Sequence, residues 1–440
     1  MQIATEIYTC KPTARIVAPL LGDVAANRFL LSTASVGDDN EIHVVEYNTK
    51  NRTVFSERIY KHNGQIFGLS PCPYDPQLCF VIVGCESDTK KGVLVRLENL
   101  SISDVSEDKD SDAKATEPLP QPEEATPEPN PENPPAPEES APKEALEGDS
   151  KEEEAVTEIS EDKECIPDDK KDGVTVEEKP TQLTILATAP RDSIVCAIWH
   201  PGNLEEGTLP HELILVYRSG YAGYQVGNDG ALSELFFYSF KEPCQCAAWD
   251  PLHTHLLAVG QGCDLRVIDI SDNSMFAERT RIHIGGITCM EFNPNRPSTL
   301  CTGGKDGMIH IWHVSGRGIT PEKSILAHSH WVSSVHFNPI QDQLLLSSST
   351  DSVITLWRLF SVSSARLKEK QQEDKKVMSL GGTRSSVYST AWSPKNLWLF
   401  CGASYEGKLL FGSVPAEEVA VLLDERSEER RVGKECRSRW

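Results

Sequence analysis

The sequence lacks the motifs that mark most enzymes and membrane proteins. No GxxxxGK[ST] or GxGxxG segment is present, which argues against a phosphate-binding loop. The 13 cysteines include no CxxC pair, and this usage suits a reducing compartment rather than a metal site. No apolar run is long enough to span a bilayer, and the N-terminus lacks the basic start of a signal peptide. We therefore expect a cytoplasmic protein with no catalytic residues, no metal and no cofactor.

Negative charge is abundant, but it is concentrated in one segment. The formal net charge is −23, and residues 101–180 hold 27 acidic and 8 basic residues, a net of −19. The same segment holds 12 of the 28 prolines and no Phe, Trp, Tyr or His. Such a composition cannot bury enough apolar surface to offset the entropy of ordering, so we predict a disordered acidic insertion.

The insertion has two interpretations: a solvated tether, or a regulatory arm that binds a partner. Its acidity argues against a nucleic-acid partner, because phosphate binding requires clustered Lys and Arg. Segments with helical amphipathicity are nearly absent elsewhere in the chain.

An internal repeat organises the rest of the sequence. The residues at offsets of 4, 9, 23 and 29 after His283 match the residues at the same offsets after His328. The two sets share Phe-Asn-Pro, then Asp306 or Asp351, then Trp312 or Trp357. A repeat of about 40–45 residues is typical of WD-repeat β-propeller blades.

Weaker copies extend the repeat along the chain. Each reads as short runs of alternating or β-branched residues separated by Gly, Asp, Asn and Pro, which favours strands and tight turns. We predict an all-β fold, a seven-bladed WD-repeat propeller, with blades one and two in 1–100 and blades three to seven in 181–423. The seven units are 13–47, 62–98, 190–226, 242–270, 283–314, 328–359 and 383–414.

The resemblance to WD repeats implies a structural role for the histidines that recur in the two copies. In such repeats a His before the first strand, an Asp in a turn and a Trp in a later strand form a buried hydrogen-bonded link. We expect these links at His283, Asp306 and Trp312, and at His328, Asp351 and Trp357.

His330 and Trp331 are the candidate partner-binding residues, and His330 has no counterpart in the upstream copy. Gly285 stands where the second copy has His330, so we expect His330 in a solvent-facing loop. Aromatic residues are favoured interface anchors, which makes Trp331 a candidate contact. The alternative is that Trp331 packs between blades. A zinc site at His330 would need two further ligands nearby, which the repeat does not supply.

Several segments of the chain resemble the EARP- and GARP-complex-interacting protein family. The similarity covers about 1–100 and 183–423, and the 328–359 unit is its most specific part. The segments that carry it are Asn27-Arg28-Phe29-Leu30, 39–45, 61–67, His328-Ser329-His330-Trp331-Val332, 342–346 and 392–407.

The resemblance implies a non-catalytic adaptor. Members of this family bind EARP and GARP tethering complexes at the trans-Golgi network and recycling endosomes, and they support vesicle capture and cargo sorting. We therefore expect a monomeric propeller that reaches membranes indirectly, through its partners.

The alternative function is a substrate receptor of a cullin-based ubiquitin ligase, to which plant relatives are linked through a Trp-Asp-x-Arg ending. Here the corresponding segments are Trp312-His313-Val314-Ser315 and Trp357-Arg358-Leu359-Phe360, which lack the arginine in its place. Residues 426–440 resemble the in-frame translation of a sequencing adapter, so we expect them to be non-native.

Overall fold

The computed structural model describes most of the chain outside the acidic segment. The predicted insertion, 101–180, and the tail, 426–440, lie outside the described residues. All of the described residues belong to one unit. They are 6–10, 13–36, 39–84, 89–100, 181–201, 211–364, 373–381 and 383–423.

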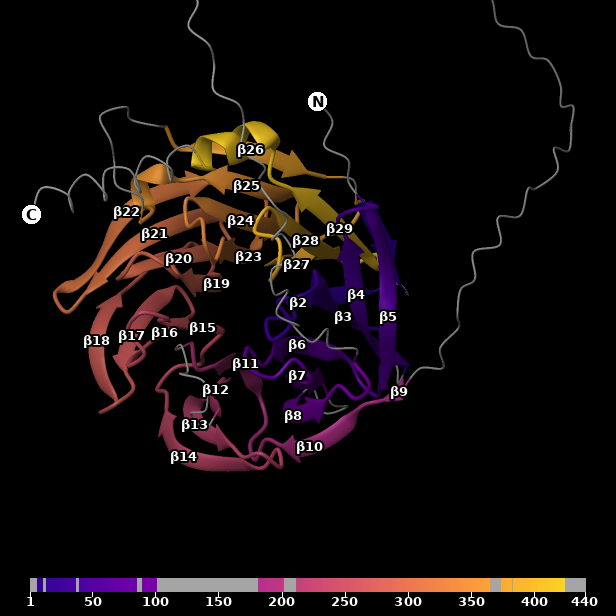
Figure 1. The fold of residues 1–440 in the computed structure, drawn as a ribbon. Coiled ribbons are helices and arrows are strands. Elements are labelled where there is room, and N and C mark those ends of the chain that lie inside the picture. The colour runs from indigo at the N-terminus through magenta and orange to yellow at the C-terminus, as the bar shows by residue number, and fades with distance from the viewer. Residues whose placement is uncertain are drawn as a thin grey trace, which may run out of the picture. The chain divides into compact units, whose positions relative to one another are not determined.

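The described residues form seven sheets that radiate around a common centre, as Figure 1 shows, and all their strand pairs are antiparallel except that of β5 with β9. This arrangement confirms the predicted seven-bladed propeller. Blade one contains β2 (Ala14–Pro19), β3 (Arg28–Thr33), β4 (Asn40–Asn48) and β5 (Thr53–His62), with β9 (Thr181–Gln182) at its edge. Blade two contains β6 (Ile66–Pro71), β7 (Leu78–Gly84), β8 (Lys90–Arg96) and β10 (Thr184–Thr188). Blade three contains β11 (Ile194–Trp199), β12 (His211–Tyr217), β13 (Gly220–Val226) and β14 (Leu232–Ser239).

The remaining four blades follow in chain order. Blade four contains β15 (Cys246–Trp249), β16 (Leu256–Gln261), β17 (Asp264–Asp269) and β18 (Ser274–Arg279). Blade five contains β19 (Ile287–Phe292), β20 (Thr299–Gly304), β21 (Met308–Ser315) and β22 (Gly318–Leu326). Blade six contains β23 (Val332–Phe337), β24 (Leu344–Ser349), β25 (Ile354–Arg358) and β26 (Lys375–Leu380), with a short 3-10 helix, η1 (Phe360–Val362). Blade seven contains β27 (Val387–Trp392), β28 (Leu399–Ser404), β29 (Lys408–Ser413) and β1 (Glu6–Thr9).

The burial of the strands explains why single blades are not stable alone. Every residue of the second strands β3, β16, β20, β24 and β28 is buried, because neighbouring blades cover both faces. The outer strands, such as β5 and β18, are mostly half-exposed or exposed. Radial stacking therefore completes the core and leaves only short outer edges.

The blade boundaries differ from the sequence division at two places. Strand β1 pairs with β29, so the N-terminal strand completes blade seven rather than blade one. Strand β10 pairs with β8, so blade two ends after the acidic segment and 181–188 do not belong to blade three. Both are outer strands, whose half-exposed residues carry little of the hydrophobic alternation on which the sequence division depended.

A β-bulge recurs at the second residue of six innermost strands. The pairing of the innermost strand with the second strand shifts in register at that residue in every blade except the fourth. A bulge adds an unpaired residue and redirects its side chain. The bulged residues are Arg15, Phe67, Val195, Thr288, Ser333 and Tyr388.

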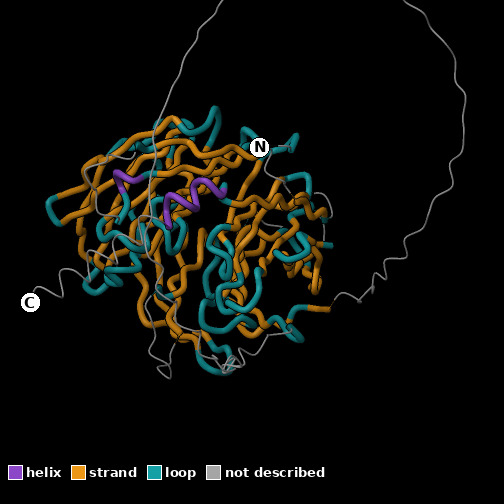
Figure 2. The backbone as a smooth tube through the Cα atoms, turned by 45° about the horizontal axis from the view of Figure 1, so that its top comes forward, coloured by secondary structure: helices purple, strands orange, loops and turns teal. Residues whose placement is uncertain are grey.

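A C-terminal helix at 416–423, drawn in purple in Figure 2, closes the described chain. It begins just after Pro415 and has two acidic residues in its first turn, both of which favour a helix N-terminus. Leu422 is buried in the core of blades six and seven, and Glu418 forms a buried ion pair with Arg358. The sequence analysis missed this helix because it is only about two turns long.

Candidate interaction face and buried blade links

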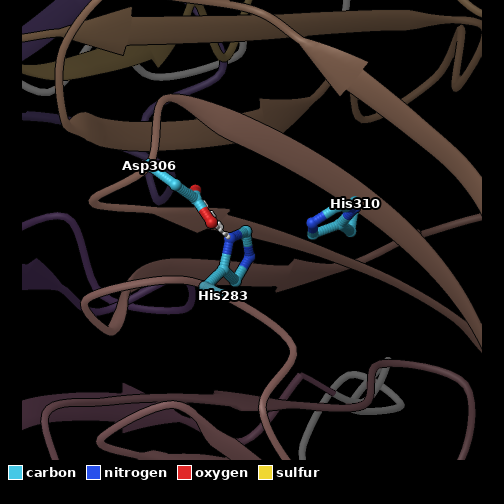
Figure 3. Close-up of side chains that lie close together, drawn as sticks. All are labelled: His283, Asp306 and His310. Atoms are coloured by element: carbon cyan, nitrogen blue, oxygen red, sulfur yellow. Dashed lines mark hydrogen bonds and ion pairs between the residues drawn. The ribbon is translucent and has the colours of Figure 1, made fainter.

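The predicted link in blade five is a continuous hydrogen-bonded chain of four side chains. His283 precedes β19 and lies 3.0 Å, Nδ1 to Oδ1, from Asp306 in the β20–β21 turn, as Figure 3 shows. Its Nε2 lies 2.9 Å from the Thr302 hydroxyl, and the Trp312 indole N–H donates to that same hydroxyl at 2.9 Å. Thr302 accepts the indole N–H and keeps its own proton to donate to Nε2 of a neutral His283, which then donates from Nδ1 to the carboxylate.

Blade six repeats the arrangement with a serine in place of the threonine. His328 Nδ1 lies 3.1 Å from Asp351 Oδ2, and its Nε2 lies 2.9 Å from the Ser347 hydroxyl. The Trp357 indole N–H donates to Ser347 at 2.9 Å. The structure thus brings together all six residues that the sequence singled out, in two separate blades.

Burial sets the protonation of these groups. Burial lowers the pKa of both His283 and His328, against the opposing pull of their aspartates. Burial also acts to raise the pKa of Asp306, but the Ile284 N–H and the His283 imidazole outweigh it and hold that pKa below its usual range. At neutral pH each link therefore joins a neutral imidazole to an ionised carboxylate.

The hydroxyl residues of both links are harder to identify from the sequence than the His, Asp and Trp. Thr302 lies 19 residues after His283, and Ser347 lies 19 residues after His328. A further matching offset, at 19 residues, was thus present in the sequence. It is harder to recognise because one residue is a threonine and the other a serine, so that only the hydroxyl is common to both.

One group of side chains in the described residues has the spacing of a metal site. The ligand atoms of His283, Asp306 and His310 lie within 4.8 Å of one another, and Figure 3 shows the His310 ring apart from the bonded pair. Both nitrogens of His283 are already hydrogen-bonded, and His310 Nδ1 lies 2.8 Å from Ser324 Oγ. A metal ion would have to displace Thr302 or Asp306 from the buried imidazole. This donor set therefore does not fit a zinc site.

The links also define one end of the propeller, which we call the top face. It is the end at which each innermost strand begins and each second strand turns into the third. The loops that carry His283, Asp306, His328 and Asp351 all lie there. Loops held by a rigid scaffold are the usual place for binding residues.

His330 and Trp331 lie on the top face, in the loop between β22 and β23. The Trp331 side chain is 45% exposed, and its ring stacks on His330 at 5.6 Å between centroids. Lys305 of blade five places its ammonium 4.8 Å from the Trp331 ring. His330 is exposed and bonds to the Thr350 hydroxyl. Trp331 thus covers the seam between two blades on one side and meets solvent on the other.

Comparisons with known proteins agree with this architecture. The family profile described as EIPR1 beta-propeller matches residues 214–357, and the profile of the WD domain, G-beta repeat, matches 374–411. EARP and GARP complex-interacting protein 1 of Macaca fascicularis is 26% identical across 94% of this chain and 97% of its own length, and the Homo sapiens protein shows the same values. EARP-interacting protein 1 of Caenorhabditis elegans is 26% identical across 56% of this chain and 72% of its own length.

These relatives are named for a protein interaction, which together with the WD propeller supports an adaptor role. Within the described ranges, no helix is both long enough and apolar enough to cross a bilayer. The chain is therefore a WD-type β-propeller that is similar to EARP and GARP complex-interacting proteins over almost its whole length, and to the EIPR1 beta-propeller profile over 214–357.

Proposed function

We propose that this protein is a non-catalytic adaptor that binds EARP and GARP tethering complexes and supports endosomal recycling and cargo sorting. The observation that carries this proposal is the alignment, across 94% of the chain, with relatives named for interaction with both complexes. We further propose that it acts as a monomer in the cytoplasm and reaches the trans-Golgi network and recycling endosomes through its partners.

The chemistry of the buried histidines supports a non-catalytic role. A general base needs a free nitrogen within reach of a substrate proton. His283 and His328 are buried, and each has both nitrogens in hydrogen bonds to neighbouring side chains. We propose that both links only hold their blades in register, as an adaptor requires of a rigid scaffold.

We propose the loop of His330 and Trp331 as the primary partner contact. A half-exposed tryptophan that is already supported by His330 and Lys305 offers a large apolar area at low entropic cost. Because the support comes from two blades, the indole is presented in a defined orientation before a partner arrives.

The alternative, a ubiquitin-ligase receptor, is disfavoured by the surroundings of Arg358. This residue is the arginine nearest to the motif of such receptors, but it is 8% exposed. Its guanidinium lies against the Phe360 ring and is paired with Glu418 of the C-terminal helix. A partner could reach it only after the helix had been displaced.

Affinity purification with mass spectrometry tests the proposal, using the chain ending at Glu425. We expect the subunits shared by EARP and GARP to be recovered, and Trp331→Ala to reduce that recovery by about tenfold or more, as for a hot-spot residue. Phe55→Ala is the matched control, because Phe55 is 44% exposed on the outer strand of blade one. Recovery of cullin-ligase components without tethering subunits would overturn the proposal in favour of the alternative.

A further inference from the structure

Three bulged residues from consecutive innermost strands meet on the top face. Arg15 of β2 places its guanidinium 5.0 Å from the Tyr388 ring of β27 and 5.2 Å from the Phe67 ring of β6. Lys90 at the start of β8 places its ammonium 4.6 Å from the same Phe67 ring. The guanidinium of blade one is thus held between aromatic rings of blades seven and two.

Arg15 differs from other arginines that lie over aromatic rings. Arg191 lies 4.1 Å from the Phe237 ring and is paired with Glu234, and Arg358 near Phe360 is paired with Glu418. Among the residues that the structure describes, none gives Arg15 a carboxylate or a hydrogen bond. A guanidinium carries five N–H donors in a planar fork that matches a carboxylate, so Arg15 retains unused capacity for an anion.

A second cation on the top face is likewise placed over an aromatic ring and is not paired with an acid. Lys305 lies over the Trp331 ring and has no ion pair with any residue in the described part of the chain. Both cations are therefore oriented by aromatic rings rather than by acids.

Hydrogen bonds and one ring contact link the top-face loops that hold the two cations. The Thr350 N–H donates to the Trp331 carbonyl at 3.1 Å, and the Ser386 hydroxyl donates to the Thr350 carbonyl at 3.2 Å. The Tyr405 N–H donates to the Ser386 carbonyl at 2.9 Å, and the half-exposed Tyr405 ring lies 5.9 Å from the Tyr388 ring. We call the group of Lys305, Trp331, Tyr405, Tyr388, Arg15 and Phe67 the aromatic arc.

We propose that the aromatic arc binds an extended acidic segment of a protein partner. One carboxylate of the segment pairs with the Arg15 guanidinium, a second pairs with Lys305, and apolar side chains between them contact Trp331 and Tyr405. The arc holds separate cations beside aromatic rings instead of a dense basic cluster, which favours a peptide over a nucleic acid. Only the identification of the partner as a tethering subunit rests on the proposed adaptor function; the chemistry rests on the arc.

A displayed library of short random peptides tests this recognition without assuming a partner. The purified full chain and its Arg15→Ala variant are each used to select peptides, at low and at high salt. We expect peptides selected by the wild-type chain to be enriched in Asp and Glu, and this enrichment to be lost with Arg15→Ala. Synthetic peptides from the selection should bind Arg15→Ala about tenfold more weakly, the cost of one charge-assisted pair. Arg15→Lys should fall between the two, because lysine keeps the charge but loses the fork.

Arg317→Ala is the matched control, since Arg317 is exposed in the turn between β21 and β22, away from the arc. The peptides that Arg317→Ala selects should show the same enrichment in Asp and Glu as those that the wild type selects. The proposal is overturned if no acidic enrichment appears, if enrichment persists in Arg15→Ala, or if only phosphorylated peptides bind. If acidic peptides are selected but no tethering subunit is recovered from cells, the arc stands and the proposed function fails. If the subunits are recovered equally with Arg15→Ala, the proposed function holds and the identification of the arc's partner as a tethering subunit is overturned.

Discussion

Glu291 in β19 reaches across the boundary between blades five and six to His336 in β23. Its Oε1 lies 3.0 Å from His336 Nδ1, and its Oε2 accepts the Phe337 backbone N–H. Burial acts to lower the pKa of His336, but Glu291 outweighs it and raises that pKa above the ordinary value. Both side chains are about one-third exposed, so solvent weakens the pair.

This pair predicts a pH-dependent contribution to stability. Because the folded pKa of His336 is raised, its contribution is fully present below the unfolded value of about 6.5 and is lost as the pH rises through the folded pKa. We expect the Tm difference between the wild type and Glu291→Gln to be largest in mild acid and to shrink with rising pH. Thermal melts of both proteins across neutral pH measure it. A difference that stays constant with pH would exclude the ion pair as its cause.

The hydroxyl of Thr302 predicts a large loss of stability on removal. In Thr302→Val, the His283 Nε2 and the Trp312 indole N–H both lose their partner inside the core. Each unsatisfied buried group costs about 1–3 kcal/mol, so we expect the free energy of unfolding to fall by about 2–6 kcal/mol. Chemical denaturation checks this against Thr320→Val, an exposed threonine on β22. Equal costs for the two variants would contradict the role of the link.

The closure of the ring predicts that the N-terminal strand stabilises blade seven. Removing residues 1–9 deletes β1 and leaves the edge of β29 without its partner. We expect a lower Tm, by about 2–4 °C for each kcal/mol lost in a domain of this size, together with aggregation through the open edge. Scanning calorimetry and light scattering measure both. A chain lacking only residues 1–5 is the control, and unfolding of the two truncated chains at one temperature would argue against closure by β1.

The ion pair of Glu418 and Arg358 predicts that the C-terminal helix is part of the folded core. Glu418→Gln leaves the buried guanidinium of Arg358 without its carboxylate, which costs about 3 kcal/mol. Glu417→Gln, one residue earlier and exposed, should cost almost nothing. Urea denaturation compares the two. Similar urea midpoints for the two variants would mean that the helix does not pair with Arg358 in solution.

The sequence predicts best what the core constrains most. His283 and Trp312 are buried, and Asp306 supplies the carboxylate that the buried imidazole needs, so few alternatives fit and the spacing recurs in the next blade. The sequence does not predict which blades β1 and β10 complete, because half-exposed outer strands carry a weak hydrophobic pattern.

The aromatic arc is invisible in the sequence for a different reason. Arg15, Phe67 and Tyr388 occupy the same bulged position in three blades, but each is a different residue type. Tyr388 meets Arg15 only because the chain closes into a ring and brings the last blade beside the first. Local sequence patterns do not contain that information.

Direct binding to a reconstituted tethering complex tests the central claim most directly. The full chain ending at Glu425 is mixed with purified EARP subunits and passed over a size-exclusion column, with Trp331→Ala and Phe55→Ala run in parallel. We predict that the wild type and Phe55→Ala co-elute with the complex and that Trp331→Ala does not. Failure of the wild type to co-elute with EARP, and then with GARP, would contradict the adaptor function.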